Sequence, residues 1–253
     1  DCARAALKKA KHIFIEKPLA NTVNEAKYIM SLAHEANVKA QVGHVERFNP
    51  AFLAIKDLDI QPMFIESHRL STFNPRGTDV SVVLDLMIHD IDIVLHLVHS
   101  NVKKVSASGV KVLSNQPDIA NARLEFDNGC VANLTASRIS MKKMRKMRLF
   151  QRDAYIAVDF GENMTEILTM SDANPDEDAF TIEINTGDAS KKRVIKMDKP
   201  VITPVNAIKM ELEQFAKAII NDTDTPVTIE DGYRALQVAH MILKKKKKNV
   251  AYR

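Results

Sequence analysis

Four acidic or imidazole side chains recur at helical spacing between Val82 and Leu97. They stand at positions i, i+4, i+7 and i+11, and they are Asp85, His89, Asp92 and His96. A helix would carry all four on one face, while the positions between them are nearly all Leu, Ile, Val or Met. Because burying a polar group without a partner is costly, these groups must pair with one another or take part in chemistry. Ligands at i and i+4 would also suit a metal ion, which supports a weaker hypothesis, a metal-dependent lyase or hydrolase.

A second charged group follows a short apolar run near the start of the chain. Ile13–Ile15 has the pattern of a strand buried on both faces. The run stops at Glu16-Lys17-Pro18, because proline cannot donate to a sheet and disfavours helix at the preceding residue. Ligands of open parallel sheets bind just beyond the carboxyl ends of the strands. Lys17 is therefore a candidate working residue, and a solvated strand end is the alternative.

Helices and strands alternate over residues 1–45. A helix through Lys11 is followed by the Ile13–Ile15 strand, and Thr22 and Glu25 have the spacing of a capping box for a helix to about Asn37. A second strand is predicted at Lys39–Val45. This alternation is typical of a parallel sheet with crossover helices, here the last third of a dinucleotide-binding fold. The phosphate-binding fingerprint G-x-G-x-x-G is missing from the sequence, so that turn either precedes residue 1 or does not exist.

The pattern changes after residue 48. Asn49-Pro50 is a strong helix start, and residues 102–201 are rich in strand signals, including a hairpin turn at Asp127-Asn128-Gly129. Helices over residues 206–221 and 230–246 are expected to pack back. The predicted fold class is α/β. The C-terminal part of a Rossmann domain (residues 1–48) precedes an α+β domain (residues 49–253) with a large, mostly antiparallel open sheet.

Composition limits the classes of partner. Of 253 residues, 45% are hydrophobic and 27% charged, and the net charge of +4 depends on the five lysines of residues 244–248. Without that run, which we interpret as a solvated helix end or tail, the chain is nearly neutral, so no nucleic-acid partner is implied. Two distant cysteines favour a reducing compartment, and no apolar run reaches the length of a membrane span. We expect a cytoplasmic protein without a membrane partner.

Four separated motifs match one family. They are Glu16-Lys17-Pro18, the run GHVERFNP at residues 43–50, the Asp85/His89/Asp92 set, and a closing pattern from Glu211 to Leu236. Together they resemble the glucose–fructose oxidoreductase, inositol dehydrogenase and MocA (Gfo/Idh/MocA) family of NAD(P)-dependent oxidoreductases. The resemblance implies a Rossmann domain followed by an α/β domain whose open sheet often forms homo-oligomers, here a dimer or tetramer. The GHVERFNP form is most similar to members acting on nucleotide sugars, such as UDP-N-acetylglucosamine 3-dehydrogenase.

The resemblance also implies roles for individual residues. Glu16, Lys17 and Pro18 would lie at the nicotinamide end of NAD or NADP, with Lys17 donating to the substrate oxygen and joined to Pro18 by a cis peptide. His89 would be the general base, since the pKa of an imidazole lies near the operating pH. Asp85 would orient His89 or bind a sugar hydroxyl. Hydride transfer to a nicotinamide needs no metal, so we predict no metal ligands.

Other side chains have two interpretations. Arg47 and Asn49 are candidate substrate-binding residues, although Arg47 is about as well suited to an internal acidic partner. Asp92 is favoured as a structural residue, and His96 and His99 as surface or core histidines. The basic stretch 141–152 is interpreted as an edge strand kept soluble by lysines, with contact to a phosphorylated ligand as the alternative. The alternative function is a non-catalytic or truncated family member, a module for ligand binding or oligomerisation.

Overall fold

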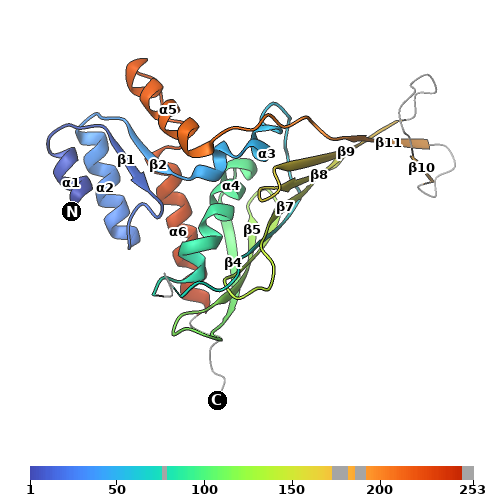
Figure 1. Ribbon diagram of the computed structural model, residues 1–253, viewed down its shortest axis with the longest axis horizontal. Helices are drawn as coiled ribbons and strands as arrows, with labels where there is room; N and C mark the ends of the chain where they lie inside the picture. Colours follow the sequence, from blue (N-terminus) through green and yellow to red (C-terminus); the bar gives the residue numbers. More distant parts are fainter. Residues whose placement is uncertain (76–78, 173–181, 186–191, 247–253) are drawn as a thin grey trace.

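The computed structural model describes residues 1–75, 79–172, 182–185 and 192–246, and its N-terminal part is a β-α-β unit (Figure 1). Its elements are α1 (Cys2–Leu7), β1 (Ile13–Glu16), α2 (Val23–Glu35) and β2 (Ala40–Gly43). The two strands are parallel and in register from Ile13↔Ala40 to Glu16↔Gly43, so their carboxyl ends meet. Thr22 and Glu25 form the predicted capping box at the start of α2. The parallel pair with its crossover helix confirms the predicted end of a Rossmann fold.

Three short elements connect this unit to the rest of the chain. They are η1 (Val45–Phe48), a 3-10 helix, then α3 (Pro50–Leu53) and, after the next strand, the π-helix η2 (Val83–Met87) that runs into α4 (Ile88–Val98). Asn49 caps α3 by accepting a hydrogen bond from the Ala51 amide, and Pro50 occupies the first helical position, as predicted.

Nine strands of the described residues form one large sheet. They are β3 (Phe64–Leu70), β4 (Val102–Val110), β5 (Ile119–Phe126), β6 (Val131–Ser137), β7 (Met144–Phe150), β8 (Ala154–Asp159), β9 (Met164–Asp172), β10 (Ile182–Asn185) and β11 (Lys192–Asp198). Their order is β10-β11-β9-β8-β7-β3-β6-β5-β4, and among these pairs β3–β6 alone is parallel. The predicted large, mostly antiparallel sheet and the hairpin at residues 127–129 are confirmed, with Gly129 at φ 87°.

One prediction about the sheet was wrong. The stretch 141–152 contains β7, which is hydrogen-bonded to β3 on one side and to β8 on the other. It is therefore an interior strand rather than an edge strand. The prediction of an edge strand relied on the lysines and arginines, which lie at the exposed start of β7. Further along the strand, Met147 and Leu149 are fully buried in the core.

Helices cover one face of the sheet. In Figure 1, α4 and the long α6 (Ile229–Lys246) lie against the strands, with the core between them. Fully buried side chains in that core include Leu124, Leu134, Leu149 and Ile91, each contributing about 1.5–3 kcal/mol by leaving water. The opposite face carries polar cross-strand pairs such as Arg148–Glu66 at 3.0 Å.

The C-terminal segment lies against the N-terminal unit. Helix α5 (Ala207–Ile220) contacts η1, and α6 contacts α2 and β2 as well as α4 and β4. The Val42 amide donates to the Val227 carbonyl, and Gln41 forms an antiparallel bridge with Thr228. The predicted domain boundary at residue 48 stays a prediction, because the two parts share these contacts.

The helices and the lysine run bear on the predictions about membranes and charge. Within the described ranges, none of the helices has the length and apolar character needed to cross a bilayer. The lysine run begins inside α6, where Lys244 and Lys245 are exposed, while residues 247 and 248 lie outside the described residues.

Gly232 sets how closely α6 approaches β2. A Cβ at this position would lie 2.5 Å from Cγ2 of Val42, a rigid and fully buried side chain. We expect Gly232→Ala to lower the free energy of unfolding by about 1–3 kcal/mol, although alanine is the better helix former. Urea unfolding measures the change, with Gly161→Ala as control because a Cβ there would meet only one atom, at 3.4 Å. A Gly232→Ala protein as stable as wild type would contradict the close approach.

Candidate active site

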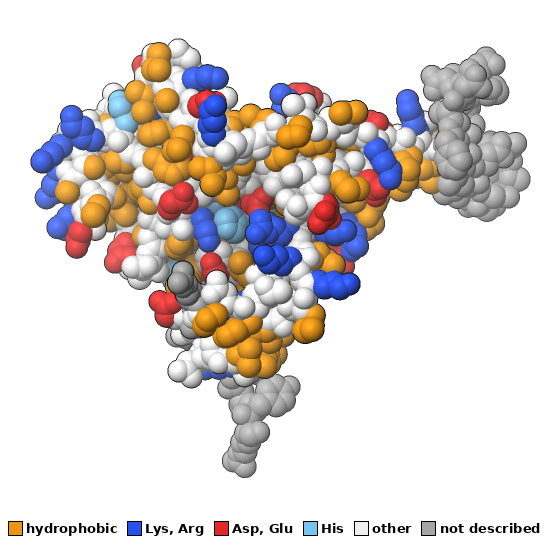
Figure 2. Space-filling view, viewed as in Figure 1, with side chains coloured by type: hydrophobic (Ala, Val, Ile, Leu, Met, Phe, Trp, Pro, Cys, Tyr) orange, Lys and Arg blue, Asp and Glu red, His pale blue; other side chains and the backbone are white. Residues whose placement is uncertain are grey.

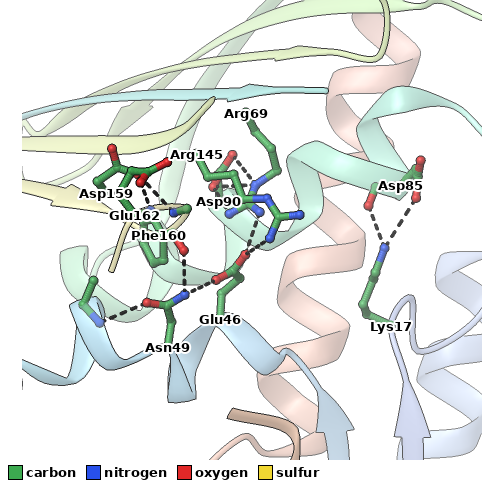
Figure 3. Close-up of polar contacts among 12 residues, drawn as sticks. Lys17, Glu46, Asn49, Arg69, Asp85, Asp90, Arg145, Asp159, Phe160 and Glu162 are labelled. Carbon is green, nitrogen blue, oxygen red and sulfur yellow. Dashed lines mark hydrogen bonds and ion pairs between the residues drawn. The ribbon is translucent and has the colours of Figure 1, made fainter. Parts of the chain in front are cut away.

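Lys17 and Asp85 meet where the N-terminal unit joins the large sheet. Lys17 Nζ donates to the Asp85 carbonyl at 2.6 Å and lies 3.7 Å from Oδ1 of the same residue (Figure 3). The Lys17 side chain is 18% exposed, and burial lowers the pKa of its ammonium group. The Lys17–Pro18 peptide is cis, as the resemblance implies. Residues 68 positions apart in the sequence are thus brought into contact.

The helix that carries His89 differs from the regular helix predicted. Residues 83–87 form a π-helix, and the α-helix begins only at Ile88. Asp85 therefore lies in the wider π turn and His89 in the first turn of α4. Such turns are common at functional sites because they alter the direction of side chains and free backbone groups. Here the Asp85 carbonyl accepts the hydrogen bond from Lys17 Nζ.

His89 lies among positively charged neighbours. Burial lowers the pKa of its imidazole well below the usual value, and Arg69, Lys17, His44 and Arg145 lower it further. Its Nδ1 atom is enclosed and has no hydrogen-bond partner among the described residues. The ring is consequently neutral at neutral pH and able to accept a proton.

His44 is a second histidine of the site, and sequence reasoning missed it. It is 1% exposed, and neither ring nitrogen has a hydrogen-bond partner in the described part of the chain. Burial lowers its pKa, which is also affected by the opposing charges of Asp92 and Arg47. The signal was its place directly after β2, at the carboxyl end of a parallel strand.

Arg47 has an internal acidic partner. Its guanidinium donates to both carboxylate oxygens of Asp92, at 2.6 and 2.9 Å, and lies 3.9 Å from Asp231. The side chains of Arg47 and Asp92 are only 6% and 2% exposed. The structural role predicted for Asp92 is confirmed. Arg47 also lines a cleft of about 780 Å³, together with the exposed His96. A contact between Arg47 and a ligand would have to be made through this cleft.

A second buried network lies beside His89. Arg69 donates to Glu46 at 2.7 Å and to both oxygens of Asp90 at 2.8–3.1 Å (Figure 3). Asn49 donates to Glu46 and to the Phe160 carbonyl, both at 3.1 Å. The polar groups of Asn49 are thus used internally, and its predicted contact with substrate stays a prediction. Sequence reasoning missed Arg69 and Asp90, because their partnership depends on the placement of β3 against α4.

Glu16, at the end of β1, and Glu211, which it influences electrostatically, differ in their surroundings. Glu16 is exposed and in register with Gly43, where a Cβ would come within 2.7 Å of its Oε2. Glu211 of α5 is 1% exposed, and Oε1 has no partner among the described residues. Burial, together with Glu16 and Asp92, raises the pKa of Glu211 to about 7.

The described residues contain no group of three or more His, Cys, Asp or Glu placed to hold a metal ion. In the proposed stripe, Asp92 is engaged by Arg47, and His96 lies against Phe52 with ring centroids 6.1 Å apart. The groups that the site brings together are the Lys17 ammonium and the imidazole of His89. A space-filling view shows basic side chains and a histidine gathered around a hollow near α4 (Figure 2).

The fold defines a class of two-part proteins, in which a Rossmann-type end precedes an open-faced sheet and a lysine and a histidine lie at the junction. Two family models match this chain. The NAD-binding Rossmann fold of the oxidoreductase family matches residues 1–44, and the C-terminal alpha/beta domain matches residues 74–252. The chain belongs to the Gfo/Idh/MocA oxidoreductase family.

Individual relatives act on sugars or cyclitols by name. The UDP-N-acetylglucosamine 3-dehydrogenase of Acidithiobacillus ferrooxidans is 37% identical over 166 residues, which are 65% of this chain. The scyllo-inositol 2-dehydrogenase (NAD(+)) of Bacillus subtilis is 30% identical over 53% of this chain and 44% of its own. The solved structure of GnnA, the A. ferrooxidans UDP-N-acetylglucosamine 3-dehydrogenase, has a TM-score of 0.85 at 29% identity, covering 97% of this chain and 74% of that one. The chain spans about half, 53%, of the length of the first of these relatives.

The buried Arg47–Asp92 pair predicts a large effect on stability. Asp92→Ala leaves a buried guanidinium short of its main acceptor, and we expect a loss of about 3–5 kcal/mol in the free energy of unfolding. The double variant Arg47→Leu/Asp92→Leu should lose less than the sum of the two single leucine variants, because it leaves neither charge unpaired. Urea unfolding of the four variants measures this coupling. Additive losses would show that the pair is not a buried unit.

Glu211 predicts a pH dependence. Its pKa is about 7 in the folded protein and near the ordinary 4.5 in the unfolded chain, so between these values the folded state holds a proton that the unfolded chain has released. This group therefore lowers the free energy of unfolding as pH rises from about 4.5 to 7, and adds no further change above that. Urea unfolding at pH 5 and pH 7 should show a smaller decrease for Glu211→Gln than for wild type. An equal decrease would contradict the assignment.

Proposed function

We propose that the whole protein is an NAD(P)-dependent dehydrogenase that transfers a hydride between the nicotinamide and a secondary alcohol of a sugar or nucleotide sugar. The observation that carries this proposal is the meeting of Lys17, at the carboxyl end of β1, with the helix that bears His89. A charged donor and a neutral base are both needed to handle a hydroxyl group that becomes a ketone.

The site residues fit the nicotinamide end of the cofactor. The carboxyl ends of β1 and β2 meet there, and the nitrogens of His44 are buried without a partner in the described residues. Glu16, Lys17 and Pro18 would hold that end together with His44. When bound, the nicotinamide dinucleotide supplies the hydride acceptor or donor.

The roles proposed for the two main residues follow from their surroundings. Lys17 has three N–H donors, and the Asp85 carbonyl takes one, so the ammonium group can also donate to the substrate oxygen. His89 would take the hydroxyl proton, which its depressed pKa allows because the ring is neutral at working pH. The side chain of Asp85 is 45% exposed and is available to bind a neighbouring hydroxyl.

The likeness to UDP-N-acetylglucosamine 3-dehydrogenases in sequence and structure supports a nucleotide sugar as substrate. We also propose a cytoplasmic homo-oligomer assembled through the sheet face opposite α4 and α6. The free cysteines Cys2 and Cys130 support the reducing compartment, and the polar cross-strand pairs support an accessible sheet face.

Turnover of the whole protein tests the roles of Lys17 and His89. We expect Lys17→Met and His89→Ala to lower kcat about 10²–10⁴-fold, as for loss of a positioned acid–base group. Reduction of NAD⁺ or NADP⁺ with UDP-N-acetylglucosamine, followed by absorbance, measures kcat. Because the His89 pKa is depressed, the acid limb of the wild-type pH–rate profile should lie below pH 6.5.

Matched controls separate chemistry from folding. Lys39→Met removes a lysine that pairs with Asp222 at the surface, and His96→Ala removes an exposed histidine of the same helix. Both should keep turnover within about twofold of wild type, as surface changes usually do. Turnover that survives Lys17→Met and His89→Ala would show that other residues perform the chemistry.

A further inference from the structure

Arg145 is a cation that the proposed chemistry does not use. It is the second residue of β7 and stands directly opposite Arg69 of β3 in the antiparallel register. Side chains at paired positions point to the same face of a sheet, so Arg145 shares with Arg69 the face that packs against α4. Unlike Arg69, it is half exposed, with 53% of its side chain accessible.

The acids around Arg145 are engaged by another residue. Its Nη1 lies 3.8 Å from Glu46 Oε1, the same oxygen that Arg69 binds at 2.7 Å. Asp90 is bound through both oxygens by Arg69 and is 2% exposed. Two arginines placed directly opposite each other repel, and Arg69 makes the shorter contacts to both acids. Arg145 thus presents a half-exposed guanidinium, whose one ion pair within the described ranges is the 3.8 Å contact with Glu46.

Arg145 lies near the two residues proposed to handle the substrate hydroxyl, Lys17 and His89. Figure 3 shows its guanidinium over Glu46, on the same side of the network as Lys17 and Asp85. Arg145, Lys17 and Arg69 all act electrostatically on His89, which places the three cations around one imidazole. A substrate that reaches His89 would therefore extend past Arg145. An anionic group on that substrate would be attracted to this position.

We propose that Arg145 binds the diphosphate of a nucleoside-diphosphate sugar whose hydroxyl group lies at His89. The planar guanidinium offers paired N–H donors that match phosphate oxygens, and a partly enclosed site strengthens such charge-assisted hydrogen bonds. The assignment rests on the proposed function, because it takes His89 as the reacting end. It also gives a role to a basic residue near the start of β7, a strand paired on both sides within the sheet.

Binding of UDP to the whole protein, saturated with NAD⁺, tests the proposal without requiring turnover. Isothermal titration should give a Kd for UDP about 10- to 100-fold weaker in Arg145→Met than in wild type, as for loss of a charge-assisted hydrogen bond. Arg145→Lys should be intermediate, since it keeps the charge but loses the paired donors. Lys146→Met is the matched control, because Lys146 is the next residue of the strand and binds Asp159 at 3.0 Å on the other face. It should leave the Kd for UDP within twofold of wild type.

Three outcomes would overturn the proposal: no UDP binding by wild type, equal Kd values in wild type and Arg145→Met, or an equal loss in Lys146→Met. Glucuronate, which carries a carboxylate instead of phosphates, identifies the anion. If Arg145→Met weakened glucuronate binding but not UDP binding, the diphosphate assignment would be wrong. If UDP binding depends on Arg145 but no nucleotide sugar is oxidised, the binding assignment stands and the proposed dehydrogenase function fails. All variants should have a Tm close to that of wild type, because the side chains of Arg145 and Lys146 are each about half exposed.

Discussion

Burial of opposite charges around η1 is the constraint on which the junction depends. The adjacent residues Glu46 and Arg47 are both almost fully buried, and each has a partner on a different element. Arg47 is bound by Asp92 of α4, and Glu46 by Arg69 of β3. Leaving any of these charges unpaired would cost several kcal/mol, so η1, α4 and β3 have essentially one favourable arrangement. That arrangement brings α4, and with it His89, toward the end of β1.

The same networks determine the electrostatics of His89. The acids near it are engaged by arginines, whereas Lys17 and Arg145 add positive charge on the open side. A neutral imidazole results, next to cations that favour an oxygen carrying developing negative charge. Positioning and proton affinity therefore have one origin, because the buried pairs that locate the histidine also keep carboxylates from raising its pKa.

Much of this arrangement could be predicted from the sequence because it depends on local rules. The capping box at Thr22, the Asn49-Pro50 helix start and the turn at Gly129 each involve residues a few positions apart. The π turn at Asp85 was not predicted, and the partner of its carbonyl, Lys17, comes from another part of the chain. The interior place of β7 was missed for a similar reason. Its basic residues suggest an edge, and only the strand order shows that β8 covers it. His44 and Arg69 were missed since their neighbours come from separate elements.

The bridge between Gln41 and Thr228 has a consequence for how the chain reaches its fold. The strand that ends at Gly43 obtains part of its backbone pairing from residues almost two hundred positions later. Closing so long a loop is entropically costly, and such non-local contacts form slowly. During synthesis, β2 and His44 can be enclosed only after Val227 and Thr228 have been made. The segment that carries Val227 and Thr228 is thus a late-arriving neighbour of β2, and its loss would disturb the surroundings of Val42 and His44.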